Sequence, residues 1–375
     1  MSADYWGTHV VGERTDIVLS AVVMSHPRRA ARAEELCRAY PELGLTVVYD
    51  PEPDGVPSAW RTARHAWAAV TPGATHHLVL QDDLALAPDF AARLREAVAA
   101  RPDDPLCLFA EWGSRTANAV RIAALHGFSW APVVDDYIPC AALVLPAQAA
   151  RGFDEYAASK STESDPDDVV LLDYLAHLGM PAWAAVENLA QHDQVESLVG
   201  NSLMGLRRSV LFAGESALAP VTDSALTGLT AVPYYDWWSQ QATLFVPDGS
   251  TVDGWAQLRS QPALRLWGVT PDEVEAEFAA LLPLPSALTD RVNRILTAEI
   301  HKSGFLIGLV SGGLGPVADI APGSTAAQAL ATLAPGGLRR VIPEQWLDTV
   351  AELLEPVVHA GVEAGLRRTP ARRDS

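Results

Sequence analysis

Apolar and polar positions alternate along the first half of the chain in blocks that predict strands and helices in turn. Short apolar runs rich in β-branched residues predict buried strands at 16–24, 45–49 and 77–81. Stretches with helical periodicity follow these strands at 30–40, 58–70 and 88–100. Strands and helices that alternate at this spacing predict an α/β fold with a mostly parallel sheet and helices on both faces.

The alternation continues less regularly up to about residue 205. Further strands are expected at 106–109, 138–145 and 182–186, and a helix that stops at a glycine is expected at 167–179. The first two of these strands are separated by an expected long loop, which contains Trp112, Trp130, Asp135 and Asp136.

The composition changes after about Gly205. We expect a loop-rich linker at 206–247, with an aromatic cluster at 234–238. The following patterns predict a mainly α-helical C-terminal region, with helical segments at 252–259, 271–282, 288–300, 325–333 and 343–364. The chain is therefore expected to divide into residues 1–205, 206–247 and 248–375.

The composition is that of a globular protein, since 49% of the 375 residues are hydrophobic and 19% are charged. A formal net charge of -19 argues against nucleic acid or an anionic membrane as the main partner. The three cysteines, Cys37, Cys107 and Cys140, form no metal-ligand pattern, so free thiols in a reducing compartment are expected. With no signal-peptide pattern and no apolar run of membrane-spanning length, we expect a cytoplasmic protein without an integral membrane segment.

Polar residues follow each of the first three predicted strands. Ser25, His26 and Arg28 come after the first, Asp50 after the second, and an aspartate pair after the third. In parallel sheets, ligands bind beyond the carboxyl ends of the strands. The sequence therefore predicts a binding site at this edge of the sheet.

The aspartate pair is Asp82 and Asp83, at the end of the run Leu-Val-Leu-Gln-Asp-Asp. Aspartates after a strand are also common in solvated turns. Their carboxylates are, however, suitable ligands for Mg²⁺ or Mn²⁺, which can bridge to the phosphates of a nucleoside diphosphate.

This segment, with the Pro-Asp-Phe that follows it, resembles the DxD region of GT-A-fold glycosyltransferases, particularly bacterial lipopolysaccharide-type enzymes that transfer sugars from nucleotide sugars. The resemblance covers about residues 16–203 and implies a GT-A, Rossmann-like domain and a divalent metal, Mn²⁺ or Mg²⁺. It implies that Asp83 binds the metal and that Asp82 contacts sugar or ribose. Gln81 stands where the family usually has an acid.

Two more blocks of the chain resemble the same family. The helix that begins at Asp167 and Asp168 is similar to the helix that supplies the catalytic base in inverting enzymes, which implies Asp168 as the base, Asp167 as the next candidate, and Asp165 after them. The segment around His192 resembles a metal-binding histidine block, although Asp193 replaces its usual glycine. In isolation, the aspartates are also typical helix caps and the histidine a typical loop residue.

A nucleotide-binding surface is also expected from the resemblance, since Ser25, His26, Arg28 and Asp50 occupy positions that line the nucleotide pocket in the family. Arg61 and Arg64 are three positions apart on the helix before the aspartate pair, so they can share a face and offset diphosphate charge.

These blocks together predict a metal-assisted, inverting glycosyltransferase that uses a nucleotide-sugar donor, preferably a UDP-sugar, and a small-molecule or peptide acceptor. A nucleotidyltransferase, or a GT-A-like binding or scaffold protein without activity, stays open as an alternative. So does a homo-oligomer formed through the C-terminal region.

Overall fold

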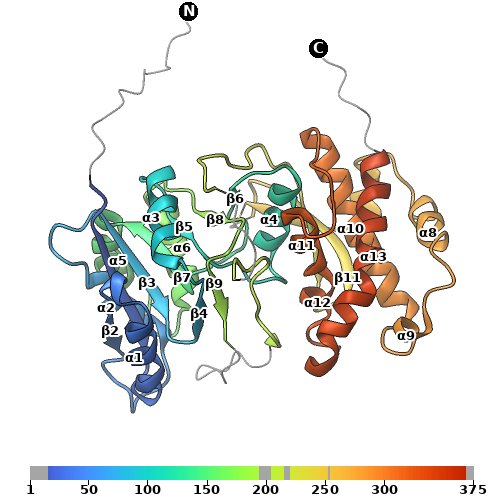
Figure 1. The fold of residues 1–375 in the computed structure, drawn as a ribbon. Coiled ribbons are helices and arrows are strands. Elements are labelled where there is room, and N and C mark those ends of the chain that lie inside the picture. Colours follow the sequence, from blue (N-terminus) through green and yellow to red (C-terminus); the bar gives the residue numbers. More distant parts are fainter. Residues whose placement is uncertain (1–15, 194–203, 215–219, 252–253, 369–375) are drawn as a thin grey trace, which may run out of the picture.

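The computed structural model describes residues 16–193, 204–214, 220–251 and 254–368. Its centre is a seven-stranded sheet with the strand order β2-β1-β3-β7-β5-β8-β6 (Figure 1). Five strands run in one direction and β7 and β6 run in the other, so the predicted α/β class with a mostly parallel sheet is confirmed. The strands are β1 (Leu19–Ser25), β2 (Thr46–Tyr49), β3 (His76–Gln81), β5 (Leu106–Cys107), β6 (Trp130–Pro132), β7 (Ala142–Pro146) and β8 (Trp183–Ala185).

Helices cover both faces of this sheet, as the apolar pattern predicts. Successive strand residues point to opposite faces. Val22 and Val79 therefore belong to one apolar cluster with α2 (Ala59–Ala68) and α5 (Ala147–Lys160), whereas Val23 and Leu78 belong to the other with α1 (Ala30–Ala39) and α3 (Phe90–Ala100). Burial on both faces explains why the strand sequences are continuous apolar runs.

The prediction of a loop between residues 109 and 138 is wrong, because this stretch contains α4 (Arg115–Leu125) and β6. All eleven residues of α4 are buried. A helix that is enclosed on every side has no amphipathic stripe, and the polar residues within this one obscure it further. The helix α5, at 147–160, also escaped sequence interpretation.

The expectations for 206–247 and 252–259 also need correction. A three-stranded antiparallel sheet forms here from β10 (Val232–Asp236), β11 (Gln241–Pro247) and β12 (Trp255–Arg259). In a five-residue segment such as β12, helical and strand periodicities are hard to distinguish. The strand also lies at the edge of its sheet with every residue at least partly exposed, so its sequence does not alternate between apolar and polar residues.

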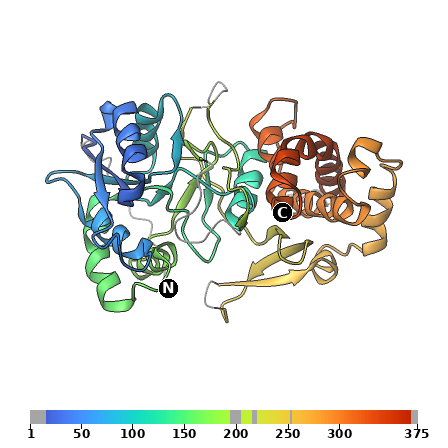
Figure 2. The ribbon, with the colours of Figure 1, turned by 90° about the horizontal axis from the view of Figure 1, so that it is seen from below.

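The C-terminal region is mainly helical, as predicted, and its helices gather on one side of the central sheet (Figure 2). The buried Arg121 of α4 connects the two parts, since its guanidinium donates to the carbonyl of Ala329 at 3.0 Å and to Thr332 Oγ1 at 3.0 Å. The main helices are α8 (Pro271–Ala279), α10 (Arg294–Leu314), α11 (Thr325–Ala331), α12 (Leu333–Leu338) and α13 (Glu344–Arg368). Among the residues described above, no helix combines the length and apolar character needed to cross a membrane.

The helices α10 and α13 pack closely because glycines line their contact. A Cβ atom at Gly308 would lie 2.1 Å from the carbonyl oxygen of Val362, and one at Gly361 would lie 2.3 Å from that of His301. Such distances are far below van der Waals contact, and the obstructing atoms belong to the backbone. The glycine-rich character of this apolar stretch is therefore a packing requirement.

Gly308→Ala is expected to lower the free energy of unfolding by about 3 kcal/mol, because the new methyl group must push two helix backbones apart. Gly313 lies in the same helix, and a Cβ atom there would meet nothing within 4 Å apart from its chain neighbours and its own helix backbone. Gly313→Ala is therefore the matched control, and it should raise stability by about 0.5–1 kcal/mol through helix propensity alone. Urea denaturation measures both. Equal effects of the two substitutions would contradict this account of the contact.

Candidate functional site

An open pocket of about 660 Å³ lies at the carboxyl ends of β1 and β3, beside the start of α6 (Asp167–His177). It brings together polar residues from segments that are far apart in the sequence, as expected for this edge of the sheet. The predicted site residues that line it are Ser25, His26, Asp50, Asp82, Asp83, Asp167 and Asp168.

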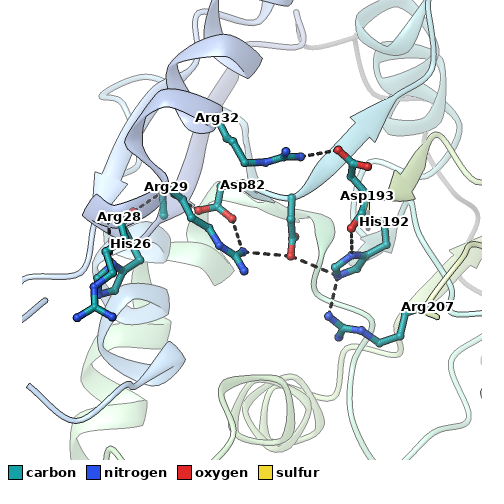
Figure 3. Close-up of polar contacts among 10 residues, drawn as sticks. His26, Arg28, Arg29, Arg32, Asp82, His192, Asp193 and Arg207 are labelled. Carbon is teal, nitrogen blue, oxygen red and sulfur yellow. Dashed lines mark hydrogen bonds and ion pairs between the residues drawn. The ribbon is translucent and has the colours of Figure 1, made fainter. Parts of the chain in front are cut away.

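The aspartate pair is held by residues at the end of β1 and just beyond it. Ser25 donates its hydroxyl to Asp82 Oδ2 at 2.6 Å. Arg29 Nη1 lies 3.0 Å from Asp82 Oδ1 and 3.3 Å from Asp83 Oδ2, so one guanidinium bridges both carboxylates (Figure 3). Both aspartates are more than 90% buried. They are therefore fixed parts of the pocket wall and not a solvated turn.

His192 meets Asp83 through a short antiparallel ribbon. The strand β4 (Leu84–Leu86) pairs with β9 (Ala190–His192), with Leu84 opposite His192. The backbone N–H of Asp193 then donates to the carbonyl of Asp83 at 2.7 Å. As a result, His192 Nε2 lies 3.7 Å from Asp83 Oδ2, and the two residues expected to share a metal are neighbours.

The hydrogen bonds of His192 define its tautomer. Nδ1 lies 3.1 Å from the carbonyl oxygen of Asp193, which can only accept, so Nδ1 carries the proton. Nε2 then has a lone pair, to which Arg207 Nη2 donates at 2.9 Å. Burial lowers the pKa of His192, which favours the neutral ring. A neutral imidazole with Nδ1 bonded to a carbonyl is the form in which histidine binds metals through Nε2.

The residues at this point fit a divalent cation. Asp83 Oδ1 is buried without a hydrogen-bond partner among the described residues, although a buried carboxylate oxygen ordinarily has one. Asp83 Oδ1 is an oxygen donor of the kind that Mn²⁺ accepts, and His192 Nε2 becomes a nitrogen donor once Arg207 moves away from its single lone pair. In the described part of the chain no group of three or more His, Cys, Asp or Glu side chains is placed to hold a metal ion. Asp193 points elsewhere, because its carboxylate pairs with Arg32 (Figure 3).

Three predicted nucleotide-binding arginines do not line the pocket. Arg28 is exposed. Arg64 donates to Asp154 on α5 at 2.7 Å, on another side of α2. Arg61 is buried and holds Asp50 through two hydrogen bonds of 3.2 Å, while its Nη2 also donates to the carbonyl of Val56. Three positions of separation let Arg61 and Arg64 share a helix face, but the tertiary packing turned that face away from the pocket.

Arg61 nevertheless supports the site indirectly. Burial by itself raises the pKa of Asp50, but the hydrogen bonds from Arg61 and from the backbone N–H of Glu52 lower it below its ordinary value. Asp50 is thus an ionised acceptor at the pocket wall. His26 has a similar structural role. Its ring forms hydrogen bonds with the backbone N–H of Arg28 and the carbonyl of Pro53.

Asp167 and Asp168 occupy the first turn of α6, where the helix dipole favours carboxylates. Asp167 is half-buried in the pocket wall, and burial together with the neighbouring Asp168 raises its pKa to about 7. Burial also raises the pKa of Asp168. A carboxylate with a pKa near neutrality can take a proton from a substrate in this pH range. Both carboxylates therefore hold a proton more readily than an exposed aspartate does.

Several pocket residues were not among the predicted site residues. Arg29 follows the predicted Arg28 in the sequence. Only the fold shows that Arg29 is largely buried in the pocket whereas Arg28 is exposed. Arg207 lies outside every motif of the sequence, and no sequence signal marks it. Asp136, Tyr137 and Glu163 also line the pocket.

Comparisons with known proteins add no assignment to this geometry. No protein-family model matches the chain. No curated protein is significantly similar to it either.

Proposed function

We propose that this chain is a GT-A-type glycosyltransferase that moves a sugar from a nucleoside-diphosphate sugar, preferably a UDP-sugar, to an acceptor hydroxyl with inversion. One observation carries the proposal. Asp83 with His192, and Asp167 with Asp168, line or adjoin a single pocket at the carboxyl edge of a mostly parallel sheet. Such a pocket has donors for a metal–diphosphate group and a separate carboxylate pair for an acceptor.

The donor half is formed by the turn after β3. A divalent ion held by Asp83 and His192, Mn²⁺ or Mg²⁺, would offset the charge of a departing diphosphate. Asp82 is oriented by Ser25 and Arg29, and its oxygens retain lone pairs that accept hydrogen bonds from sugar or ribose hydroxyls. Asp50 provides a second ionised acceptor for a ribose hydroxyl.

The acceptor half is formed by the first turn of α6. In the proposed reaction, the acceptor oxygen bonds to the anomeric carbon as the bond from that carbon to the diphosphate oxygen breaks. The nucleoside diphosphate leaves with the bonding electrons, and Asp167 or Asp168 takes the hydroxyl proton. We further propose a small-molecule or peptide acceptor and the cytoplasm as the compartment, where three free cysteines stay reduced.

Thermal-shift measurements with UDP-, GDP- and CDP-sugars, each with Mn²⁺ or with EDTA, test this proposal. We expect one nucleotide to raise the melting temperature by several degrees with Mn²⁺ and less with EDTA, because a ligand that binds only the folded state stabilises it. The nucleotide sugar that stabilises the protein should then be turned over, with its sugar transferred to water or to an acceptor. No stabilisation by any of them would contradict the proposal and favour a binding module without this chemistry.

A further inference from the structure

The pocket is strongly acidic for a site that takes a diphosphate. Its described lining contains eight carboxylates but only two arginines, Arg29 and Arg207, and no lysine. A diphosphate would be repelled by this wall unless cationic groups face it directly. The way in which the two arginines are paired therefore decides where an anion can bind.

The two guanidiniums differ in their partners. Arg29 bridges Asp82 and Asp83, so carboxylates already compensate its charge. Arg207 instead donates to the neutral ring of His192. No carboxylate oxygen of the described residues lies within ion-pair distance of it. Figure 3 shows Arg29 beside Asp82 and Arg207 beside His192. Arg207 is thus half-buried and forms no direct ion pair with a described carboxylate, although its charge also acts on Asp168 nearby.

The backbone around Arg207 is held firmly by its neighbours. Trp112 Nε1 donates to the carbonyl of Leu206 at 2.9 Å, and the backbone N–H of Trp112 donates to the carbonyl of Arg208 at 2.8 Å. Arg208 also pairs with Asp348 of α13 at 2.6 Å. The contacts on both sides of Arg207 fix its backbone, while its own side chain extends into the pocket.

The C-terminal region contributes directly to this arrangement. Arg339, which is 4% exposed, donates from Nε to the carbonyl of Met204 at 3.0 Å. Gly205 lies so close to α12 that a Cβ atom there would be 2.9 Å from the carbonyl oxygen of Arg339. The segment that carries Arg207 is therefore seated on the helical region, which makes that region part of the pocket's construction.

We propose that Arg207 is the principal protein ligand for the diphosphate of the donor, with Arg29 as a second ligand on the opposite side. Its planar fork matches two phosphate oxygens. A cation on His192 Nε2 would take the lone pair to which Arg207 donates, so cation binding would leave this guanidinium to the diphosphate. This inference rests on the proposed function for the identity of the diphosphate carrier. The anion site itself is open to an independent test with a simpler probe.

Isothermal titration calorimetry with inorganic pyrophosphate tests the site without a nucleotide or a sugar. The full chain is titrated in EDTA and again with Mn²⁺, for the wild type, Arg207→Gln and Arg207→Lys. We expect Arg207→Gln to weaken pyrophosphate binding by tenfold or more, and Arg207→Lys to weaken it less, since a charged hydrogen bond is worth roughly that factor. Arg38→Gln, which removes an exposed arginine on α1, is the charge-matched control and should bind as the wild type does.

Two results would overturn the inference: wild-type protein that binds no pyrophosphate in either condition, or Arg207→Gln with wild-type affinity in both. The melting temperature of Arg207→Gln should be close to that of the wild type, because one hydrogen bond to a neutral ring is lost. The two proposals also fail separately. If pyrophosphate binding depends on Arg207 but no nucleotide sugar is turned over, glycosyl transfer is refuted and the anion site stands.

Discussion

Asp167→Asn is expected to lower kcat/KM for glycosyl transfer by about a thousandfold, the order of magnitude that a positioned general base contributes. Asparagine keeps the size of the side chain but cannot take the acceptor proton. The wild-type kcat/KM should rise with pH and level off above about pH 7, because the raised pKa of Asp167 places its ionisation there. A pH–rate profile measured with the donor found by thermal shift shows both effects.

The same substitution should make the protein more stable at pH 8. The pKa of Asp167 is raised to about 7 in the folded state, whereas an unfolded aspartate has a pKa of about 4. Between these values the folded protein holds a proton that the unfolded chain has lost, so the contribution of this group to stability falls as pH rises through that window. Asparagine carries no such dependence. An inactive variant with a higher melting temperature above pH 7 would distinguish a lost base from a damaged fold.

Asp173 supplies the matched control, since it lies on the exposed side of the same helix. Asp173→Asn should leave both kcat/KM and its pH dependence unchanged. Asp168→Asn serves as the comparison within the carboxylate pair, and the larger loss identifies the base. If neither Asp167→Asn nor Asp168→Asn changes the rate by more than a few fold, the proposed acceptor half is wrong.

Asp83→Asn is expected to abolish the effect of Mn²⁺ on donor binding and to lower kcat/KM by about a thousandfold. The buried Asp83 Oδ1 has no partner within the described residues, and Oδ2 faces His192. An amide in this place loses the negative charge that a divalent cation requires. Removal of one group that stabilises developing charge commonly reduces rates by about 10²–10³-fold.

Calorimetry with UDP, with and without Mn²⁺, measures this effect apart from turnover. Wild-type affinity should increase on addition of Mn²⁺, while the affinity of Asp83→Asn should not respond. Asp89→Asn, at an exposed position before α3, removes the same charge six residues away and should behave as the wild type does. A full Mn²⁺ response in Asp83→Asn would show that the cation binds without this carboxylate.

The sequence alone was sufficient for the edge of the sheet where the pocket lies. The first three strands are apolar runs that end in polar residues, and parallel strands place those ends at one edge. Ser25, Asp50, Asp82 and Asp83 therefore line the pocket as expected. The helix start at Asp167 was equally readable, because helical periodicity and the glycine that ends it are local signals.

Other parts of the site have no local signal. Asp83 and His192 meet because β4 pairs with β9, and an apolar pattern specifies which face of a strand is buried but not which strand lies beside it. The helix α4 and the edge strand β12 were missed for a related reason. A helix that is buried on all sides, and a strand that is buried on neither face, show no periodic alternation of apolar and polar residues.

The arginines illustrate the division most clearly. Sequence spacing allowed Arg61 and Arg64 to share a helix face, but packing paired them with Asp50 and Asp154 and left them outside the pocket. Arg207, which no motif marks, lines the pocket because Trp112 and the C-terminal helices hold its segment there. The sequence by itself determined the α/β class, the sheet edge at which the pocket lies and the acidic residues on it, since these depend on local periodicity. Only the tertiary structure decided which cations face that edge, because the position of a long side chain depends on contacts between distant segments.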